Sequence, residues 1–116
     1  MRIRQLPSIG LIAAIAILAG QAAAASDGKA VFGGDCASCH GNEGQGTPGL
    51  APALKGDAFV TGSKAEDVLA TVKDGRAGDQ KKFKDMPIAM PAWGGKLSDA
   101  DIQAVVDFIR KDLQKQ

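Results

Sequence analysis

Cysteine and histidine are nearly absent from this sequence. The chain has two cysteines and one histidine, and all three lie within the five residues from Cys36 to His40. A framework of several disulfides is excluded, because two cysteines allow only one bond. A zinc site built only from these residue types is also excluded, since such a site takes about four ligands. The clustering therefore needs another chemical explanation.

Large aromatic side chains are also scarce. The chain has no tyrosine, one tryptophan and four phenylalanines, whereas fifteen glycines increase the entropy that is lost on folding. A domain this small buries only about 60–65% of its unfolded surface and is marginally stable alone. The composition therefore predicts that something other than side chains fills the middle of the domain.

No apolar run reaches the length of a typical membrane-spanning helix, which needs about 20 residues. Segment 1–25 begins with basic residues, continues with the apolar run 9–20 and ends in the small residues 23–25. This is the pattern of a cleaved secretory signal rather than of an uncleaved anchor. We predict cleavage after Ala25 and one mature domain, 26–116. A lipid anchor at the cut is excluded, because no cysteine stands there.

Neither sign of charge dominates in the predicted mature chain. Without Arg2 and Arg4 it keeps 12 basic side chains against 13 acidic ones, a net charge of −1. Nucleic-acid binding depends on basic side chains that neutralise phosphates. We therefore expect no nucleic acid among its partners.

Three segments have helical patterns, and none has a convincing strand pattern. The first starts near Ser26 or Asp27 and runs toward Cys36. The second starts at the capping-box pattern 63–66 and is expected to stop at Gly75. The third follows a similar pattern at Ser98 and carries an apolar stripe of Ile102, Val105, Val106, Ile109 and Leu113.

Two segments between these helices, 41–62 and 75–96, are rich in glycine and proline and are expected to be loops. Long loops are unusual in a domain of this size. Wrapping around a prosthetic group would explain them.

The stretch Cys36-Ala37-Ser38-Cys39-His40 has the form C-x-x-C-H. A redox dithiol would need only C-x-x-C and usually follows a strand. A zinc site would need a carboxylate as fourth ligand, and adjacent Cys39 and His40 give poor tetrahedral geometry. A disulfide across two residues would contribute little stability. Covalent attachment of haem c, which occurs outside the cytoplasm, fits the motif and the export signal best.

In this interpretation Cys36 and Cys39 bind the vinyl groups of one haem, and His40 is the proximal iron ligand. No second histidine exists, so the sixth ligand is a methionine, a lysine or asparagine, or nothing. After signal cleavage the only methionines are Met86 and Met90. Each precedes a proline, which holds the methionine backbone extended.

Three stretches resemble single-haem class I c-type cytochromes of bacterial type over nearly the whole mature chain: "GKAVFGGDCASCHGNEGQG", "LAPALKG" and "MPAWGGKLSDADIQAVVDFI". The resemblance implies an all-α cytochrome c fold, with crossing N- and C-terminal helices and loops around one covalent haem. It favours Met90 over Met86 as the sixth ligand, because Met90-Pro91 has about the family's spacing from the helix start at Ser98.

The resemblance also implies further roles in the haem pocket. The Pro52 carbonyl would accept a hydrogen bond from the His40 Nδ1–H group, which fixes the imidazole. Leu54 would pack on the haem, and Trp93 would pack against the haem wall.

Two residues of the first predicted helix match family positions that cross the C-terminal helix. Gly28 would let the two backbones approach, and Phe32 would fill the contact with Phe108 or Ile109.

The loop "AGDQKKFKDMPIAMP" departs from the family, because it is long and holds a second Met-Pro. Its basic residues Lys81, Lys82 and Lys84 are interpreted as solvated, with docking of an acidic partner as the alternative. Arg76 is likewise expected to face solvent rather than to pair with a haem propionate.

These features predict a monomeric periplasmic electron carrier, not an enzyme, that serves redox protein partners such as a dehydrogenase, reductase or oxidase. No stable membrane insertion is expected after signal cleavage. One alternative is a haem enzyme or gas-binding sensor with a weak or open sixth position. Another is a dedicated subunit of a dehydrogenase or oxidase complex.

Mass spectrometry tests the motif and the signal peptide together. Protein exported from cells that have haem-maturation machinery should show the mass of chain 26–116 plus one haem. A chain at its haem-free mass, with two free thiols, would contradict the assignment of Cys36 and Cys39.

Overall fold

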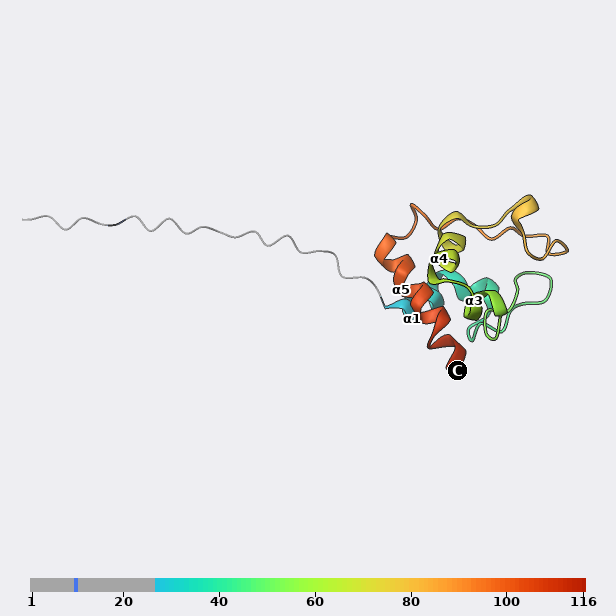
Figure 1. The fold of residues 1–116 in the computed structure, drawn as a ribbon, viewed down its shortest axis with the longest axis horizontal. Coiled ribbons are helices and arrows are strands. Elements are labelled where there is room, and N and C mark those ends of the chain that lie inside the picture. Colours follow the sequence, from blue (N-terminus) through green and yellow to red (C-terminus); the bar gives the residue numbers. More distant parts are fainter. Residues whose placement is uncertain (1–9, 11–26) are drawn as a thin grey trace, which may run out of the picture.

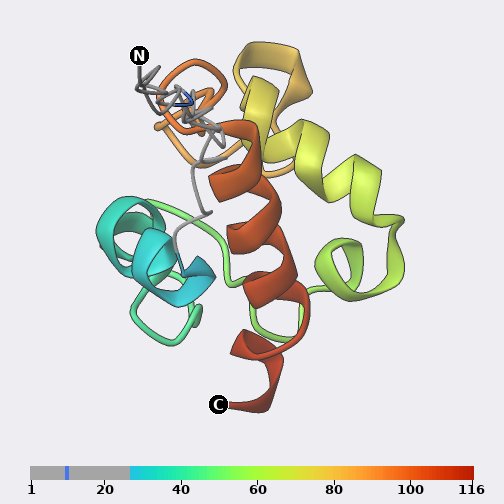
Figure 2. The same cartoon turned by 90° about the vertical axis from the view of Figure 1, so that its left-hand side faces the viewer.

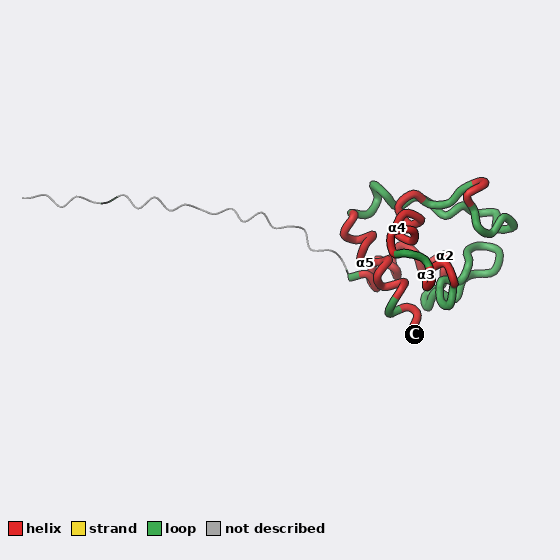
Figure 3. The backbone as a smooth tube through the Cα atoms, viewed as in Figure 1, coloured by secondary structure: helices red, strands yellow, loops and turns green. Residues whose placement is uncertain are grey.

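The computed structural model describes Gly10 and residues 27–116, and all regular structure in this part is helical (Figures 1 and 3). The N-terminal helical segment comprises α1 (Gly28–Val31), the π-helical turn η1 (Phe32–Cys36) and α2 (Ala37–His40). The remaining elements are α3 (Ala58–Gly62), α4 (Ala65–Asp74), the 3₁₀ turn η2 (Gly78–Gln80), α5 (Asp99–Arg110) and the 3₁₀ turn η3 (Leu113–Lys115). The predicted all-α class is confirmed.

The predicted signal peptide, 1–25, lies outside the described residues except for Gly10. Within the described part, no helix has both the length and the apolar character needed to cross a membrane.

Helix α5 lies in the middle of the domain and carries more of the buried core than any other element. Figure 2 shows it between the N-terminal helical segment on one side and α4 on the other. The stripe predicted from the sequence is buried, and its fully buried members are Ile102, Val105, Val106 and Leu113. The Ser98 hydroxyl accepts a hydrogen bond from the Asp101 N–H (3.1 Å), so the predicted cap of this helix is confirmed.

The N-terminal helical segment crosses α5 at a point of very close approach. Gly28 is buried against the backbone of α5, where a Cβ atom would overlap the carbonyl oxygen of Ala104. Next to it the rings of Phe32 and Phe108 lie 5.5 Å apart between centroids, tilted by 50°. The expected roles of Gly28 and Phe32 are confirmed, and the contact sets the direction in which the helical segment leaves α5.

The capping box predicted at residues 63–66 is wrong. Lys64, not Ser63, occupies the N-cap position of α4, and its side chain forms no capping hydrogen bond. Ser63 instead ends α3, and its carbonyl accepts a hydrogen bond from the Arg110 guanidinium (2.9 Å). The predicted stop of α4 at Gly75 is confirmed, because this residue has φ +69°, where a side chain would be strained.

Helix α3 lies in a segment that was expected to be entirely loop. Its N-cap is Asp57, whose carboxylate accepts hydrogen bonds from the N–H groups of Phe59 (2.9 Å) and Val60 (3.1 Å). Gly56-Asp57 before Ala58 is a signal that could have identified this start. The helix matters for the site, because it brings Phe59 and Val60 to the wall of the cavity described below.

Substitution of Gly28 tests the close approach of the two helices. Gly28→Ala should lower the free energy of unfolding by about 1–3 kcal/mol, because the added methyl group forces the helices apart. Gly34→Ala is the matched control, since a Cβ atom at Gly34 meets nothing within 4 Å. It should leave stability unchanged or raise it by up to about 1 kcal/mol, because alanine favours helix over glycine. Denaturant titration of the haem-loaded protein measures both, and equal stabilities would contradict the close approach.

Candidate functional site

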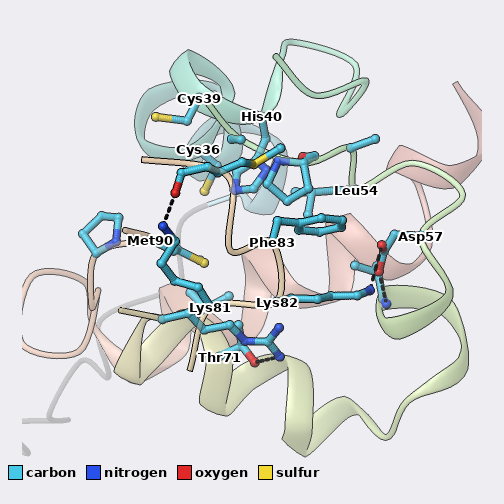
Figure 4. A pocket seen from close by; sticks show the side chains of 18 of the residues that line it. Cys36, Cys39, His40, Leu54, Asp57, Thr71, Lys81, Lys82, Phe83 and Met90 are labelled. Atoms are coloured by element: carbon cyan, nitrogen blue, oxygen red, sulfur yellow. Dashed lines mark hydrogen bonds and ion pairs between the residues drawn. The ribbon is translucent and has the colours of Figure 1, made fainter. Parts of the chain in front are cut away.

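A cavity opens between the N-terminal helical segment and the chain that follows α4 (Figure 4). It has a volume of about 1190 Å³ when the solvent at its mouth is included. Its walls come from η1, α2, α3, α4, α5 and the two long loops, so it lies at the centre of the domain. Cofactor pockets enclose roughly 300–1,000 Å³, so the cavity has room for a group of that size.

The cysteines of the C-x-x-C-H motif line one side of this cavity. Cys36 and Cys39 are three residues apart, about one helical turn, and no disulfide joins them. Burial raises the pKa of the Cys36 thiol to about 11, with smaller contributions from the Asp35 carboxylate and from Cys39. This thiol is therefore protonated at neutral pH.

That pKa argues against a redox dithiol, because such motifs work through a cysteine whose pKa is lowered. A metal centre built from side chains finds no support either. Across Gly10 and residues 27–116, no three Cys, His, Asp or Glu side chains come together as metal ligands.

His40 is buried on the same side of the cavity, with only 8% of its surface exposed. Its Nδ1 atom lies 2.8 Å from the backbone carbonyl oxygen of Pro52, the contact that the family resemblance implied. Because a carbonyl only accepts hydrogen bonds, Nδ1 is the donor in this contact, and Nε2 is the ring nitrogen left to bind a metal. The backbone secures this arrangement, since the Gly46 N–H donates to the carbonyl of His40 (2.7 Å).

Met86 and Met90 also line the cavity, but their backbones are held differently. Met90 pairs with Arg76 through two backbone hydrogen bonds of 3.0 Å, in an isolated antiparallel bridge. This bridge ties Met90 to the end of α4. Met86 lies inside the loop between the bridged residues, where its N–H donates to Phe83 (3.3 Å) and its carbonyl accepts from the Lys81 ammonium.

The other residues expected in the pocket also line the cavity. Leu54 and Trp93 are half-buried and pack against the hydrophobic core. The sequence did not indicate the apolar wall formed by Phe59, Val60, Val68 and Val72, which needs α3 and α4 to come together. The valines of α4 were recognised only as an apolar helix face.

Among the basic residues after α4, Lys82 and Lys84 are exposed as expected, whereas Arg76 and Lys81 differ from the expectation. Arg76 and Lys81 are half-buried and line the cavity. Lys82 forms an ion pair with Asp57 (3.3 Å), and the Lys84 ammonium donates to the carbonyl of Asp79. The acceptor of Lys82 is thus the carboxylate that caps α3, and that of Lys84 is a backbone carbonyl of η2.

The residues around the cavity fit a haem. Figure 4 shows Cys36, Cys39 and His40 along one side of the cavity, with Lys81 and Lys82 across from them. Two thiols, an imidazole with one free nitrogen and two thioethers share one largely apolar space. These groups are the attachment and axial ligands that c-type haems use.

Comparison with known proteins identifies the family. Residues 23–109 match the family model described as "Cytochrome C oxidase, cbb3-type, subunit III". The chain is 35% identical over 94 residues to the cbb3-type cytochrome c oxidase subunit CcoP of Azospirillum brasilense, covering 76% of this chain and 28% of that protein. It thus spans under a third of the length of these oxidase subunits.

A small cytochrome matches along almost its entire length. The chain is 33% identical over 91 residues to cytochrome c6 of Microcystis aeruginosa, covering 77% of this chain and 98% of that protein. Among solved structures, cytochrome c6C from Synechococcus sp. PCC 7002 superposes with a TM-score of 0.57 at 27% identity. The superposition covers 78% of this chain and 99% of the cytochrome c6C chain.

The sequence matches and the structural superposition both cover nearly all of the described domain. The chain therefore belongs to the cytochrome c family of the cbb3 subunit III type, as a class I c-type cytochrome with one covalently attached haem c.

Proposed function

We propose that this protein carries single electrons between redox proteins in the periplasm and has no catalytic activity of its own. Cys36 and Cys39 would hold the haem through thioether bonds, and His40 and Met90 would bind its iron. The iron of a bound haem supplies the chemistry, because it accepts and releases one electron.

One observation carries this proposal: all the side chains that a His/Met-ligated c-type haem requires line the same cavity. Met90 is favoured over Met86, because the bridge to Arg76 fixes its backbone from both sides. A ligand held in this way keeps its position in both oxidation states, so little reorganisation accompanies electron transfer.

The residues around the cavity set the properties of the carrier. The hydrogen bond from His40 Nδ1 to Pro52 fixes the orientation of the imidazole and increases its basicity as a ligand. A methionine opposite histidine raises the reduction potential. The apolar wall of Val60, Val68 and Val72 keeps water from the middle of the site.

A carrier explains the site better than a haem enzyme or a gas sensor. Those functions need an open position on the iron, whereas two methionines line this cavity. The export signal predicted at residues 1–25 supports the periplasmic location. Among the described residues, no helix could hold the protein in a membrane by spanning it.

A second candidate is a dedicated electron-transfer subunit of an oxidase complex. It is favoured by the match to the cbb3-type subunit III model. Purification of the native protein distinguishes the two candidates: a free carrier is recovered alone, whereas a subunit is recovered with its complex.

Carbon monoxide tests the carrier function. The reduced haem-loaded protein should not bind carbon monoxide at neutral pH, because methionine occupies the sixth position. The oxidised protein should show the near-infrared band that arises from sulfur-to-iron charge transfer. Binding of carbon monoxide together with absence of this band would favour the enzyme or sensor alternative.

A pair of substitutions tests the choice between the two methionines. Met90→Ala should abolish the near-infrared band and lower the reduction potential, because the thioether that favours ferrous iron is lost. Met86→Ala is the matched control and should keep the band and nearly the same potential. If the two variants behave the other way round, Met86 is the ligand, and the proposed carrier function remains.

A further inference from the structure

The 3₁₀ turn η3, which follows α5, contacts the loop behind His40 at two separate points. Leu113 is fully buried and packs so closely on Gly44 that a Cβ atom there would lie 2.6 Å from Leu113 Cδ2. Gln114 forms hydrogen bonds with backbone groups 58 and 60 residues earlier in the chain. Figure 2 shows a loop drawn in green beside the end of α5 that is nearest the C-terminus.

The side-chain amide of Gln114 is half-buried and uses both of its polar atoms. Its oxygen accepts a hydrogen bond from the Gly56 N–H (2.7 Å). Its nitrogen donates to the carbonyls of Leu54 (3.1 Å) and Ile109 (2.9 Å). An amide nitrogen has two donors, so both are occupied, and only one orientation of the amide satisfies all three partners. Because Ile109 belongs to α5, Gln114 links that helix to the loop.

The two loop groups that Gln114 binds belong to one tight turn. The Leu54 carbonyl also accepts a hydrogen bond from the Asp57 N–H (3.3 Å), which closes a turn over residues 54–57. Gly56 is the third residue of this turn and has φ +73°, as a type II turn requires. Its N–H group takes no part in closing the turn and is therefore available to Gln114.

This turn begins two residues after Pro52, whose carbonyl contacts His40 Nδ1 (2.8 Å). Proline has no N–H group, so hydrogen bonds of its neighbours must hold the Pro52 carbonyl in place. On one side, Ala51 forms a backbone bridge within the loop. On the other side, the Leu54 N–H donates to the Gly44 carbonyl (2.8 Å).

The loop needs an anchor outside itself. It contains five glycines with positive φ, which lose much conformational entropy when they are fixed: Gly41, Gly44, Gly46, Gly49 and Gly56. In the described part of the chain, the hydrogen bonds to segment 51–56 come from within residues 40–57, except those of Gln114. Gln114 therefore ties this segment to the rest of the domain.

We propose that Gln114 is a positioning residue for the axial histidine. By holding Leu54 and Gly56 against α5, it keeps the Pro52 carbonyl at His40 Nδ1. This rests on the proposed function, because His40 must bind the iron of a haem. The residue acts through the loop, since it does not line the cavity.

The proposal has a consequence for the reduction potential. A carbonyl held at Nδ1 makes the imidazole a more basic ligand, which favours ferric iron. Loss of Gln114 would loosen the turn and weaken this hydrogen bond, so the potential should rise. A purely structural role predicts lower stability without any change at His40.

The experiment is proton NMR of the reduced, haem-loaded protein, together with a redox titration. Gln114→Met keeps the length of the side chain and removes its hydrogen bonds. The His40 Nδ1–H resonance should move upfield, and this proton should exchange with solvent about ten times faster or more, because two hydrogen bonds to the loop are lost. The potential should rise.

Two variants serve as controls. Gln103→Met makes the same change on the exposed face of α5, where Gln103 binds only Asp107 of the same helix (3.2 Å). It should leave the resonance and the potential unchanged. Arg110→Gln removes contacts with the carbonyls of Val60 and Ser63. It should lower stability and leave the Nδ1–H resonance in place, which separates positioning from general destabilisation.

The Nδ1–H signal decides the outcome. A wild-type chemical shift and exchange rate in Gln114→Met, with haem attached, would overturn the proposal and leave the carrier function intact. Absence of covalent haem from the wild type would instead overturn the carrier function. If Gln114→Met does not accumulate, Gln114→Asn keeps the amide on a shorter side chain that cannot reach all three partners. It should shift the signal in the same direction by less, and an unchanged signal would then overturn the proposal.

Discussion

The crossing of the N-terminal helical segment and α5 is the contact on which the rest of the structure depends. At Gly28 the two backbones meet with no side chain between them, and Phe32 packs against Phe108 one turn later. The helical segment continues without a break to His40, so this crossing also directs the motif toward the cavity. At its other end, α5 leads to Gln114, whose side-chain amide binds the backbone at Leu54 and Gly56. Both sides of the His40 loop are thus held against one helix.

Each side of the cavity is then fixed by hydrogen bonds to the backbone of a distant segment. On the histidine side, the Pro52 carbonyl binds the imidazole twelve residues away. On the methionine side, the backbone bridge holds Met90 against Arg76, which lies fourteen residues earlier in the chain. The same bridge pairs the backbone of Arg76 with that of the proposed sixth ligand, so both residues depend on one support. A change that opens the bridge would alter both.

Local patterns in the sequence predicted the features that depend on local interactions. The cap at Ser98 was recognised because Ser98 and Asp101 contact each other within one turn. The similar pattern at Ser63 failed, because the carbonyl of Ser63 binds Arg110, which lies 47 residues away. Helix α3 has five residues, too few to show the repeat of apolar residues that is typical of a helix. Its effect on Arg76 was therefore not predictable, since the position of that guanidinium depends on Phe59. The C-x-x-C-H motif, in contrast, predicted its part of the site from five adjacent residues.

The bridge between Arg76 and Met90 fixes both ends of the 77–89 loop, which includes Lys81, Phe83 and Met86 of the cavity lining. The free-energy cost of closing a loop between two fixed ends rises by only about 0.6 kcal/mol for each doubling of the loop's length. Insertions and deletions in this loop, whose Ile88 is exposed, therefore cost little free energy of folding. They leave Arg76 and Met90 paired. Such changes would alter the loop side chains that line the cavity, while Arg76 and Met90 keep their backbone pairing. Divergent lineages of such a domain would then differ most along this part of the cavity wall and least in the backbone that holds the proposed sixth ligand.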